Sequence, residues 1–326
     1  MSEEGTGVSG ATAMEQPLAA VVWDFDWSLV NENSDTWIFQ QLGSPATNEI
    51  MKRKHIQWTR RCDQAITHLQ VQDGVSIDQI KSTFAQLPVF PEVITMIRSL
   101  RENGADQFIV SDANTFFIDA FVGAHEGLAD CFSKIVSNRA WVQDAADADI
   151  QPPPASSGDA DSSDSTDAGL SGTAATVAPE VLLRIAAYHE HECRTGVCPP
   201  NLCKGLVISQ ELFGESGQLP SGRVIYVGDG TGDLCAAMRL RETDVLLVRR
   251  DFRLDKFLQR QAAAAQQAAA AAAHAESDSS TSAKTTEQHT PTTLRCRVVR
   301  WGNGVELFQA IEKLMKRSDS SLGRAC

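Results

Sequence analysis

Residues 18–28 read LAAVVWDFDWS, a short apolar run that ends on two aspartates, Asp24 and Asp26. A continuous apolar run of this length is typical of a strand that is buried on both faces of a parallel sheet. Stretches of helical character separate it from three further runs of the same kind, at residues 107–110, 224–227 and 245–248. The sequence therefore predicts an α/β fold built on a doubly wound parallel sheet of the Rossmann-like type.

Polar residues follow three of these four runs directly. Asp24 closes the first, Ser111 and Asp112 close the second, and Asp229 closes the third after one glycine. In open α/β sheets, ligands bind outside the carboxyl ends of the strands. We therefore expect these side chains to converge on one crevice.

The pair of aspartates at the first strand end indicates a specific chemistry. Two carboxylates spaced by two along an extended strand point to the same side. One of them can attack phosphorus while the other protonates the leaving oxygen. An isolated D-x-D is more often a turn with two solvated acids, but the preceding strand and the later motifs favour catalysis at Asp24 and Asp26.

The later motifs supply the groups that a bound phosphate needs. The Ser111 hydroxyl, followed by helical N–H groups, suits a phosphoryl oxygen, although such a residue is often a simple helix cap. Lys204 opens a helix and would neutralise charge that accumulates on the phosphate. Asp229 and Asp233, in the run GDGTGD, suit a hard cation such as Mg²⁺.

The stretch between the first two strands is helical in character. Ser76 and Gln79 fit a capping box, and apolar residues then recur at helical spacing as far as Leu87. A second amphipathic pattern runs over residues 93–100 and is closed by Gly104. We expect residues 35–104 to form a helical cap over the crevice.

Two low-complexity segments interrupt the α/β core, which we expect at residues 18–34 and 105–320. The first, about 143–179, contains three successive prolines and then mainly Asp, Ser, Gly, Thr and Ala. The second, about 259–293, is an Ala/Gln tract followed by Ser, Thr and Glu. Neither can bury enough apolar surface to offset its ordering entropy, so both are expected to be disordered insertions.

Composition excludes several classes of protein. The 42 acidic residues outnumber the 29 basic ones, giving a formal net charge of −13, which argues against nucleic-acid binding. No apolar run reaches the roughly 18–20 residues that a membrane-spanning helix needs. The N-terminus lacks the basic and apolar regions of a secretory signal, so we expect a cytoplasmic protein without membrane insertion.

The order of the motifs resembles that of the haloacid dehalogenase-like hydrolases. These carry D-x-D-x-[ST] after a first strand, a Ser or Thr after a second, a Lys, and G-D-G-x-x-D after a later strand. The runs at residues 31–35, 111–114 and 198–204 resemble the phosphoethanolamine/phosphocholine phosphatase branch more narrowly. Plant relatives linked to pyrophosphate or thiamine phosphate share those runs.

The resemblance implies a role for each matching residue. Asp24 would be the aspartyl-phosphate nucleophile and a Mg²⁺ ligand, and Asp26 the general acid/base that binds Mg²⁺ through its backbone carbonyl. The other implied roles are phosphoryl binding by Ser111 and Lys204, metal binding by Asp229, support of the metal or the lysine by Asp233, and contact with a cationic head group by Asp35 and Asp112.

The function that follows is a Mg²⁺-dependent phosphomonoesterase acting on a small phosphorylated metabolite. Phosphoethanolamine or phosphocholine is the favoured substrate, and a pyrophosphatase or a thiamine-phosphate phosphatase of the same fold is the alternative. A non-catalytic regulatory or binding protein is less favoured, because every catalytic residue type is present.

Three residues depart from the family pattern. Ser28 replaces the usual Thr but keeps the hydroxyl, and Asn31 stands where relatives often have a carboxylate. Trp27 is bulkier than the usual residue after the second aspartate. It could be an aromatic wall for a quaternary ammonium, or an indole packed under the cap.

Eight cysteines without a secretory signal indicate mostly reduced thiols. A cluster of histidines and cysteines, at His189, His191, Cys193, Cys198 and Cys203, precedes Lys204. A structural zinc clip is conceivable there, although the stronger paired C-x2-C signature is absent. Packed or redox-sensitive thiols are the simpler interpretation, and either would leave the phosphatase assignment unchanged.

Overall fold

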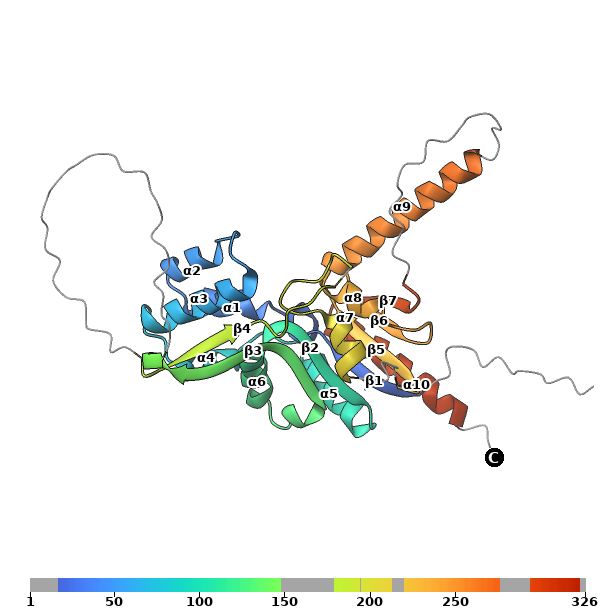
Figure 1. Ribbon diagram of the computed structural model, residues 1–326. Helices are drawn as coiled ribbons and strands as arrows, with labels where there is room; N and C mark the ends of the chain where they lie inside the picture. The colour runs from blue at the N-terminus through green and yellow to red at the C-terminus, as the bar shows by residue number, and fades with distance from the viewer. Residues whose placement is uncertain (1–16, 148–178, 194, 213–219, 276–293, 323–326) are drawn as a thin grey trace, which may run out of the picture.

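A seven-stranded sheet forms the centre of the computed structural model, which describes residues 17–147, 179–193, 195–212, 220–275 and 294–322 (Figure 1). The strand order is β4-β3-β2-β1-β5-β6-β7, and β3 and β4 pair antiparallel while the other pairs are parallel. The strands are β1 (Leu18–Trp23), β2 (Asp106–Asn114), β3 (Lys134–Asp144), β4 (Val181–Ala186), β5 (Arg223–Gly228), β6 (Val245–Arg249) and β7 (Arg297–Trp301).

Helices fill the connections between these strands. They are α1 (Ser34–Leu42), α2 (Pro45–Met51), α3 (Trp58–Val71), α4 (Ile77–Phe84), α5 (Pro91–Glu102), α6 (Thr115–Ala124), α7 (Lys204–Val207), α8 (Asp233–Ala237), α9 (Arg253–Ala275) and α10 (Gly304–Leu322). Short helical turns complete the set: η1 (Phe25–Leu29), η2 (Ala129–Cys131), η3 (Ala145–Asp147) and η4 (Ile208–Leu212).

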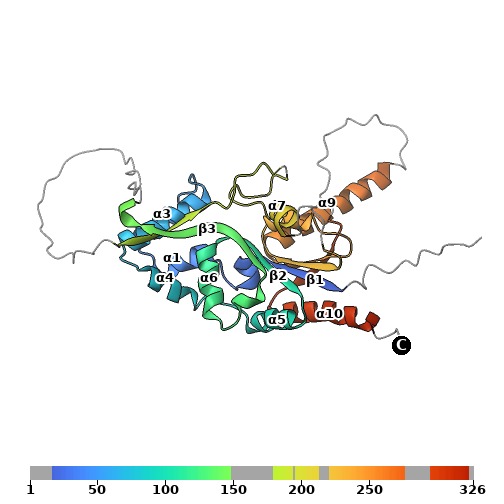
Figure 2. The ribbon, with the colours of Figure 1, turned by 60° about the horizontal axis from the view of Figure 1, so that its bottom comes forward.

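Both faces of the sheet are buried, as the apolar runs predict. In β1, Val21 and Trp23 belong to one hydrophobic cluster, whereas Ala20 and Val22 belong to a second. Residues of α5, α6 and α10 pack in the first cluster, and residues of α7, α8 and the start of α9 pack in the second. Figure 2 shows α5 and α10 lying together along one face. The predicted doubly wound α/β architecture is therefore confirmed.

Three strands escaped the sequence analysis. β4 forms one edge of the sheet and β3 lies next to it, and both strands include exposed or only partly buried residues, so neither reads as a continuous apolar run. Trp141 and Val142 of β3 are 43% and 49% exposed. β7 closes the other edge of the sheet with charged residues at two of its five positions. The apolar pattern of these three strands, at or next to the edges of the sheet, was therefore too weak to identify them from the sequence.

The antiparallel pair β3–β4 supports the helices of the predicted cap. Gln70 of α3 exchanges two hydrogen bonds with the backbone of Leu183, at 3.2 and 2.8 Å. Asp63 of α3 forms an ion pair with Arg184 at 2.7 Å. Helices α1 to α4 lie together at this end of the molecule, and α3 rests on β4 (Figure 1). Helix α5, which the expected range 35–104 includes, packs instead against α10 and β2.

The structure corrects the extent of the two expected insertions. Residues 259–275 form the second part of α9, which projects away from the sheet (Figure 1). The first turn of α9 is held in place by the buried side chain of Leu254 and by an ion pair between Asp255 and Arg300 at 2.6 Å. The alanines that follow have high helix propensity and extend the helix from this turn. Residues 143–147 belong to β3 and η3. Most of the remainder of both segments, at 148–178 and 276–293, lies outside the described residues.

Within the described residues, no helix combines the length and the apolar character that crossing a membrane requires.

Candidate active site

Lys204 gathers the predicted site residues at the carboxyl ends of β1, β2 and β5. Its Nζ lies 2.7 Å from Asp24 Oδ1, 2.7 Å from Asp233 Oδ1 and 4.0 Å from Asp112 Oδ1. Only 3% of the lysine side chain is exposed, so these are contacts of a buried ammonium. Acidic side chains from the ends of β1 and β2 and from the start of α8 therefore meet around one cation at the start of α7.

The loop after β1 turns sharply and presents the two aspartates. Asp24 Oδ1 accepts a hydrogen bond from the backbone N–H of Phe25 at 2.7 Å. Trp27 has a φ of 55°, which is uncommon for a residue other than glycine. Its backbone N–H donates to the carbonyl of Glu32 at 3.0 Å, and its carbonyl accepts from Arg249 at 2.6 Å. These two bonds hold the strained turn.

The Trp27 ring packs against the end of β6 and the loop after it. Its centroid lies 5.5 Å from that of Phe252, and the guanidinium of Arg249 lies 5.6 Å from it. Arg249 also donates to Asn31 Oδ1, which gives this departure from the family pattern a local role. The indole therefore packs against Phe252 and Arg249.

Asp26 lies in a different environment from Asp24. Its Oδ1 accepts from the backbone N–H of Ser34 at 2.9 Å, and its Oδ2 accepts from the Asn33 amide at 2.9 Å. Burial, followed by the charge of Asp35, raises the pKa of Asp26 well above its usual value, although the Ser34 hydrogen bonds oppose this shift. Such a carboxyl group can carry a proton near neutral pH.

The Asp233 carboxylate accepts hydrogen bonds that hold the glycine-rich loop after β5 in place. Its Oδ1 accepts from Lys204 and from the Tyr226 hydroxyl, both at 2.7 Å. Its Oδ2 accepts from the backbone N–H groups of Asp229 and Gly230, at 3.0 and 2.9 Å. A Cβ at position 228 would come within 2.6 Å of this carboxylate, so a glycine is required there. Asp233 therefore anchors both the lysine and the loop.

Three carboxylates form a group that fits a hard divalent cation. One oxygen from each of Asp24, Asp229 and Asp233 lies within 4.8 Å of the others, and all three residues are buried. Burial, then the charges of Asp24 and Asp233, raises the pKa of Asp229 to about 9. Burial and then the charge of Asp233 raise the pKa of Asp24 as well. Buried carboxylates that repel one another in this way are the donors that Mg²⁺ prefers.

Ser111 and Asp112 lie at the end of β2, beside this group. Ile109 pairs with Trp23, so Ser111 sits next to the start of the Asp24 loop. Ser111 is fully buried, and its Oγ accepts from the Ala113 N–H at 3.2 Å. The Asp112 side chain is 42% exposed, and its charge raises the pKa of both Asp24 and Asp26. Asp112 therefore lies close enough to Asp24 and Asp26 to influence the pKa of both.

Asp35 approaches the same site from the first turn of α1. It is buried, and its Oδ2 accepts a 2.7 Å hydrogen bond from the Trp58 indole. Burial is the main cause that raises the pKa of Asp35 to about 6, and the charge of Asp112 adds to the shift. All eight residues singled out in the sequence therefore lie around one region.

Several residues that shape this region were not identified from the sequence. Asn33 and Tyr226 each carried a signal: Asn33 stands at a helix N-cap next to the matched runs, and Tyr226 is a hydroxyl-bearing residue inside a buried strand. Trp58 and Arg249 carried none, because their partners lie 23 and 222 residues away in the chain.

Comparisons with known proteins identify the family to which the chain belongs. The family described as "Putative Phosphatase" matches residues 19–162 and 170–282. A thiamine phosphate phosphatase-like protein of Arabidopsis thaliana is 34% identical over 72% of this chain and 82% of its own length. Inorganic pyrophosphatase 1 of Arabidopsis thaliana is 31% identical over 70% of this chain and 66% of its own length.

A pyridoxal phosphate phosphatase, PHOSPHO2 of Bos taurus, is 26% identical over 91% of this chain and 98% of its own length. These relatives share the phosphatase activity in their names but differ in the phosphate compound named. On the extent of the family match and on these identities, the chain belongs to this phosphatase family and is a phosphatase.

Proposed function

We propose that the protein is a Mg²⁺-dependent phosphomonoesterase that hydrolyses the phosphate ester of a small cationic alcohol, phosphoethanolamine or phosphocholine, through a phosphorylated Asp24. The observation that carries this proposal is the contrast between the two aspartates. Lys204 pairs with Asp24 and opposes the rise in the pKa of Asp24 that burial causes, whereas Asp26 is bound by neutral donors and lies beside Asp35, whose charge raises the pKa of Asp26 further. Two carboxyl groups in such different environments can divide the roles of nucleophile and acid.

In the first step, Asp24 attacks phosphorus and the bond from phosphorus to the alcohol oxygen breaks. The hydrogen bond and the ion pair described for the Asp24 carboxylate both involve Oδ1, so we assign the attack to Oδ2. Asp26 donates its proton to the departing alkoxide oxygen, and the leaving group departs as the alcohol with its ammonium charge unchanged. Lys204 and Ser111 hold the phosphoryl oxygens during the transfer.

In the second step, Asp26, now a carboxylate, removes a proton from water as the water attacks the phosphorylated Asp24. The acyl phosphate bond breaks, inorganic phosphate leaves, and Asp24 returns as a carboxylate. Asp26 is protonated again and ready for another cycle. One residue thereby serves as acid in the first step and as base in the second.

Asp24 and Asp229 would hold the Mg²⁺ ion, together with the backbone carbonyl of Asp26. When bound, the ion supplies charge neutralisation between the carboxylates and the incoming phosphate. Because all four hydrogen bonds described above engage the Asp233 carboxylate, its contribution to the metal site is to keep Lys204 and the Asp229 loop in place.

Activity is expected to disappear in excess EDTA and to return when Mg²⁺ is added back. Without a cation, the buried Asp24 and Asp229 repel the phosphate and one another. Ca²⁺ is expected to support turnover poorly, because it favours longer bonds and higher coordination numbers. Phosphate release from phosphoethanolamine measures the effect. An undiminished rate in excess chelator would contradict the metal requirement.

The proposed head-group site rests on the position of two acids outside the metal group. Asp35 and Asp112 each influence the pKa of Asp26, so both lie near the point where a leaving alcohol would emerge. Asp35 is buried and Asp112 is partly open to solvent. A positively charged alcohol would gain charge pairing with both, whereas a neutral alcohol would not.

Replacing Asp35 with asparagine is expected to lower kcat/KM for phosphoethanolamine about tenfold to hundredfold more than for glycerol phosphate. This corresponds to a charge-assisted contact on the order of 1–3 kcal/mol. The asparagine oxygen can still accept the Trp58 hydrogen bond, so the cap should keep its structure. Asp112→Asn should show a smaller differential loss, because solvent screens its exposed charge. Equal losses on both substrates would assign Asp35 to the fold alone.

The preference for phosphocholine over glycerol phosphate is expected to decrease as pH falls through about 6. The raised pKa of Asp35, about 6, means that this side chain is negative above that pH and neutral below it. The choline charge is permanent, but the phosphates of both substrates titrate in the same range, so Asp35→Asn serves as the reference for that titration. The preference should change more across this range in the unmodified enzyme than in Asp35→Asn. The same pH dependence in both enzymes would remove Asp35 from the head-group site.

Thiamine phosphate is a second candidate, because its thiazolium ring is also cationic and a relative with 34% identity is described as thiamine phosphate phosphatase-like. It would use the same two acids, so direct comparison of kcat/KM values decides between the candidates. Pyrophosphate fits less well, since its leaving group is an anion that Asp35 and Asp112 would repel.

A further inference from the structure

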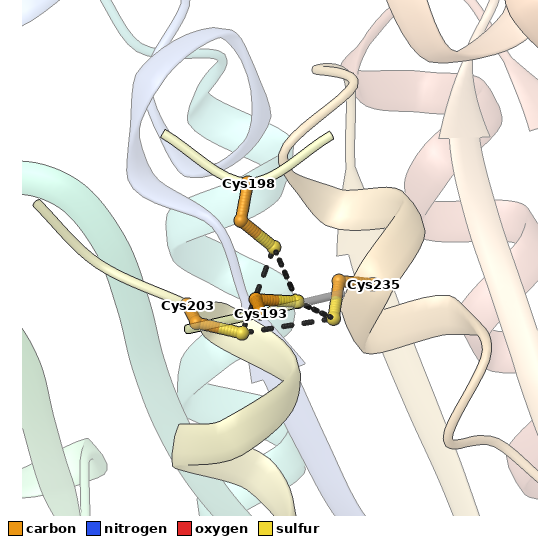
Figure 3. Close-up of side chains that lie close together, drawn as sticks. All are labelled: Cys193, Cys198, Cys203 and Cys235. Carbon is orange, nitrogen blue, oxygen red and sulfur yellow. Dashed lines mark hydrogen bonds between the residues drawn. The ribbon is translucent and has the colours of Figure 1, made fainter. Parts of the chain in front are cut away.

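Four cysteine sulfurs converge beside the active site (Figure 3). Cys193, Cys198 and Cys203 come from the segment that precedes α7, and Cys235 comes from α8. All four sulfurs lie within 4.8 Å of one another. Neighbouring Sγ atoms are separated by 3.5 Å (Cys198–Cys193), 3.6 Å (Cys193–Cys235), 3.7 Å (Cys203–Cys235) and 3.6 Å (Cys198–Cys203).

These distances match a tetrahedral metal site. Four sulfurs at about 2.3 Å from a central Zn²⁺ would lie about 3.8 Å apart in an ideal tetrahedron. A flat ring with sides of 3.6 Å would place opposite sulfurs about 5.1 Å apart, which exceeds the 4.8 Å that bounds every pair here. The sulfurs therefore do not lie in one plane but surround a central point.

We propose that these four cysteines bind one Zn²⁺ ion in a structural site. Each thiol would release its proton to solvent and bind the ion as a thiolate. Thiolates favour zinc among the common divalent cations, and four protein ligands close the coordination shell without leaving a position for substrate. The site is distinct from the carboxylate group proposed for Mg²⁺.

The structure changes the composition of the cluster seen in the sequence. The two histidines are not ligands: His189 Nε2 accepts from the Cys203 backbone N–H at 3.0 Å, and His191 Nδ1 accepts from that of Cys193 at 3.2 Å. Each histidine orients the backbone of a cysteine instead. The fourth ligand, Cys235, follows Cys203 by 32 residues and therefore escaped the spacing pattern.

The proposed ion would cross-link the two segments that carry Lys204 and Asp233. Cys203 directly precedes Lys204, and Cys235 follows Asp233 by two residues. The ammonium and the carboxylate of these neighbours form the 2.7 Å ion pair at the centre of the active site. A Cβ at Gly205 would lie 2.5 Å from Cys235 Sγ, so the close approach of α7 to α8 requires glycine at this position.

The first test is the metal content of the full-length protein, purified without added metal or chelator and measured by inductively coupled plasma mass spectrometry. We expect about one zinc per chain. The Asp24→Asn variant should retain it, since that substitution alters only the carboxylate group. A protein that shows Mg²⁺-dependent phosphatase activity but contains less than a tenth of an equivalent of zinc would overturn the proposal.

The second test assigns the ion to the cysteines. Cys198 is half-buried. The substitution Cys198→Ser should reduce the amount of bound zinc at least fivefold after dialysis against a chelator of moderate affinity. Cys131→Ser is the matched control, because Cys131 is buried in η2 and a serine could keep its hydrogen bond to the Gly127 carbonyl. That variant should retain zinc. Equal zinc retention in both variants would contradict the assignment.

A third measurement does not depend on the folding of any variant. When Co²⁺ replaces zinc in the unmodified protein, thiolate ligation should give strong sulfur-to-metal charge-transfer absorption in the near ultraviolet. Iron in place of zinc, or an intact mass lower by two hydrogens that maps to a disulfide within the cluster, would each overturn the proposal.

Discussion

Replacing Asp24 with asparagine is expected to lower kcat/KM by at least about 10⁴-fold, the scale on which loss of a covalent nucleophile acts. The amide is a poor nucleophile towards phosphorus and cannot form a stable acyl phosphate. Its oxygen can still accept the Phe25 N–H bond, and Lys204 keeps its partner Asp233. The circular dichroism spectrum and thermal unfolding should therefore stay close to those of the unmodified enzyme.

Trapping the intermediate makes this prediction specific to Asp24. Rapid acid quenching during turnover should yield a phosphorylated peptide that contains Asp24 in the unmodified enzyme and none in Asp24→Asn. Asp78→Asn is the matched control, since Asp78 is an exposed residue in the first turn of α4. Substantial turnover in a folded Asp24→Asn variant would contradict the nucleophile assignment.

Replacing Asp26 with asparagine is expected to lower kcat for phosphoethanolamine about 10²–10⁴-fold, which is the usual contribution of a general acid or base. The amide can accept the Ser34 bond but cannot transfer a proton. The raised pKa of Asp26 indicates that the unmodified residue holds its proton until the alcohol departs.

The choice of leaving group separates the two roles of Asp26. p-Nitrophenolate leaves without protonation, so Asp26→Asn should still release a rapid burst of about one equivalent from p-nitrophenyl phosphate. Hydrolysis of the phosphorylated Asp24 still needs a base, so the steady rate after the burst should remain slow. Equal slowing of the burst and of the steady rate would show that Asp26 serves binding or folding instead.

The zinc site and the phosphatase assignment can fail independently. Loss of zinc without loss of the phosphorylated Asp24 would leave the reaction in place and remove only the cross-link beside Lys204. Conversely, a stoichiometric zinc ion in the inactive Asp24→Asn variant would support the cysteine site without bearing on the reaction.

Local patterns along the chain determined the centre of the fold. The runs that became β1, β2, β5 and β6 could be recognised because each is buried on both faces and therefore uninterrupted by polar residues. The aspartates that follow them could be placed at one edge, because the carboxyl ends of parallel strands meet there. Edge strands such as β4, and helix α9 within an alanine tract, carried no comparable signal.

Only the tertiary structure decided how the site residues are paired. Lys204 reaches Asp233 across 29 residues, Asp35 meets Trp58 across 23, and Cys235 joins a cysteine group that begins 42 residues earlier. Residue type and spacing indicate which groups can take part in chemistry, because these are properties of short segments. The packing of α7 against α8 and of α3 against β4 brings these groups within a few ångströms of one another. Those distances decide which groups share a proton, an ion pair or a metal, and no local pattern in the chain encodes them.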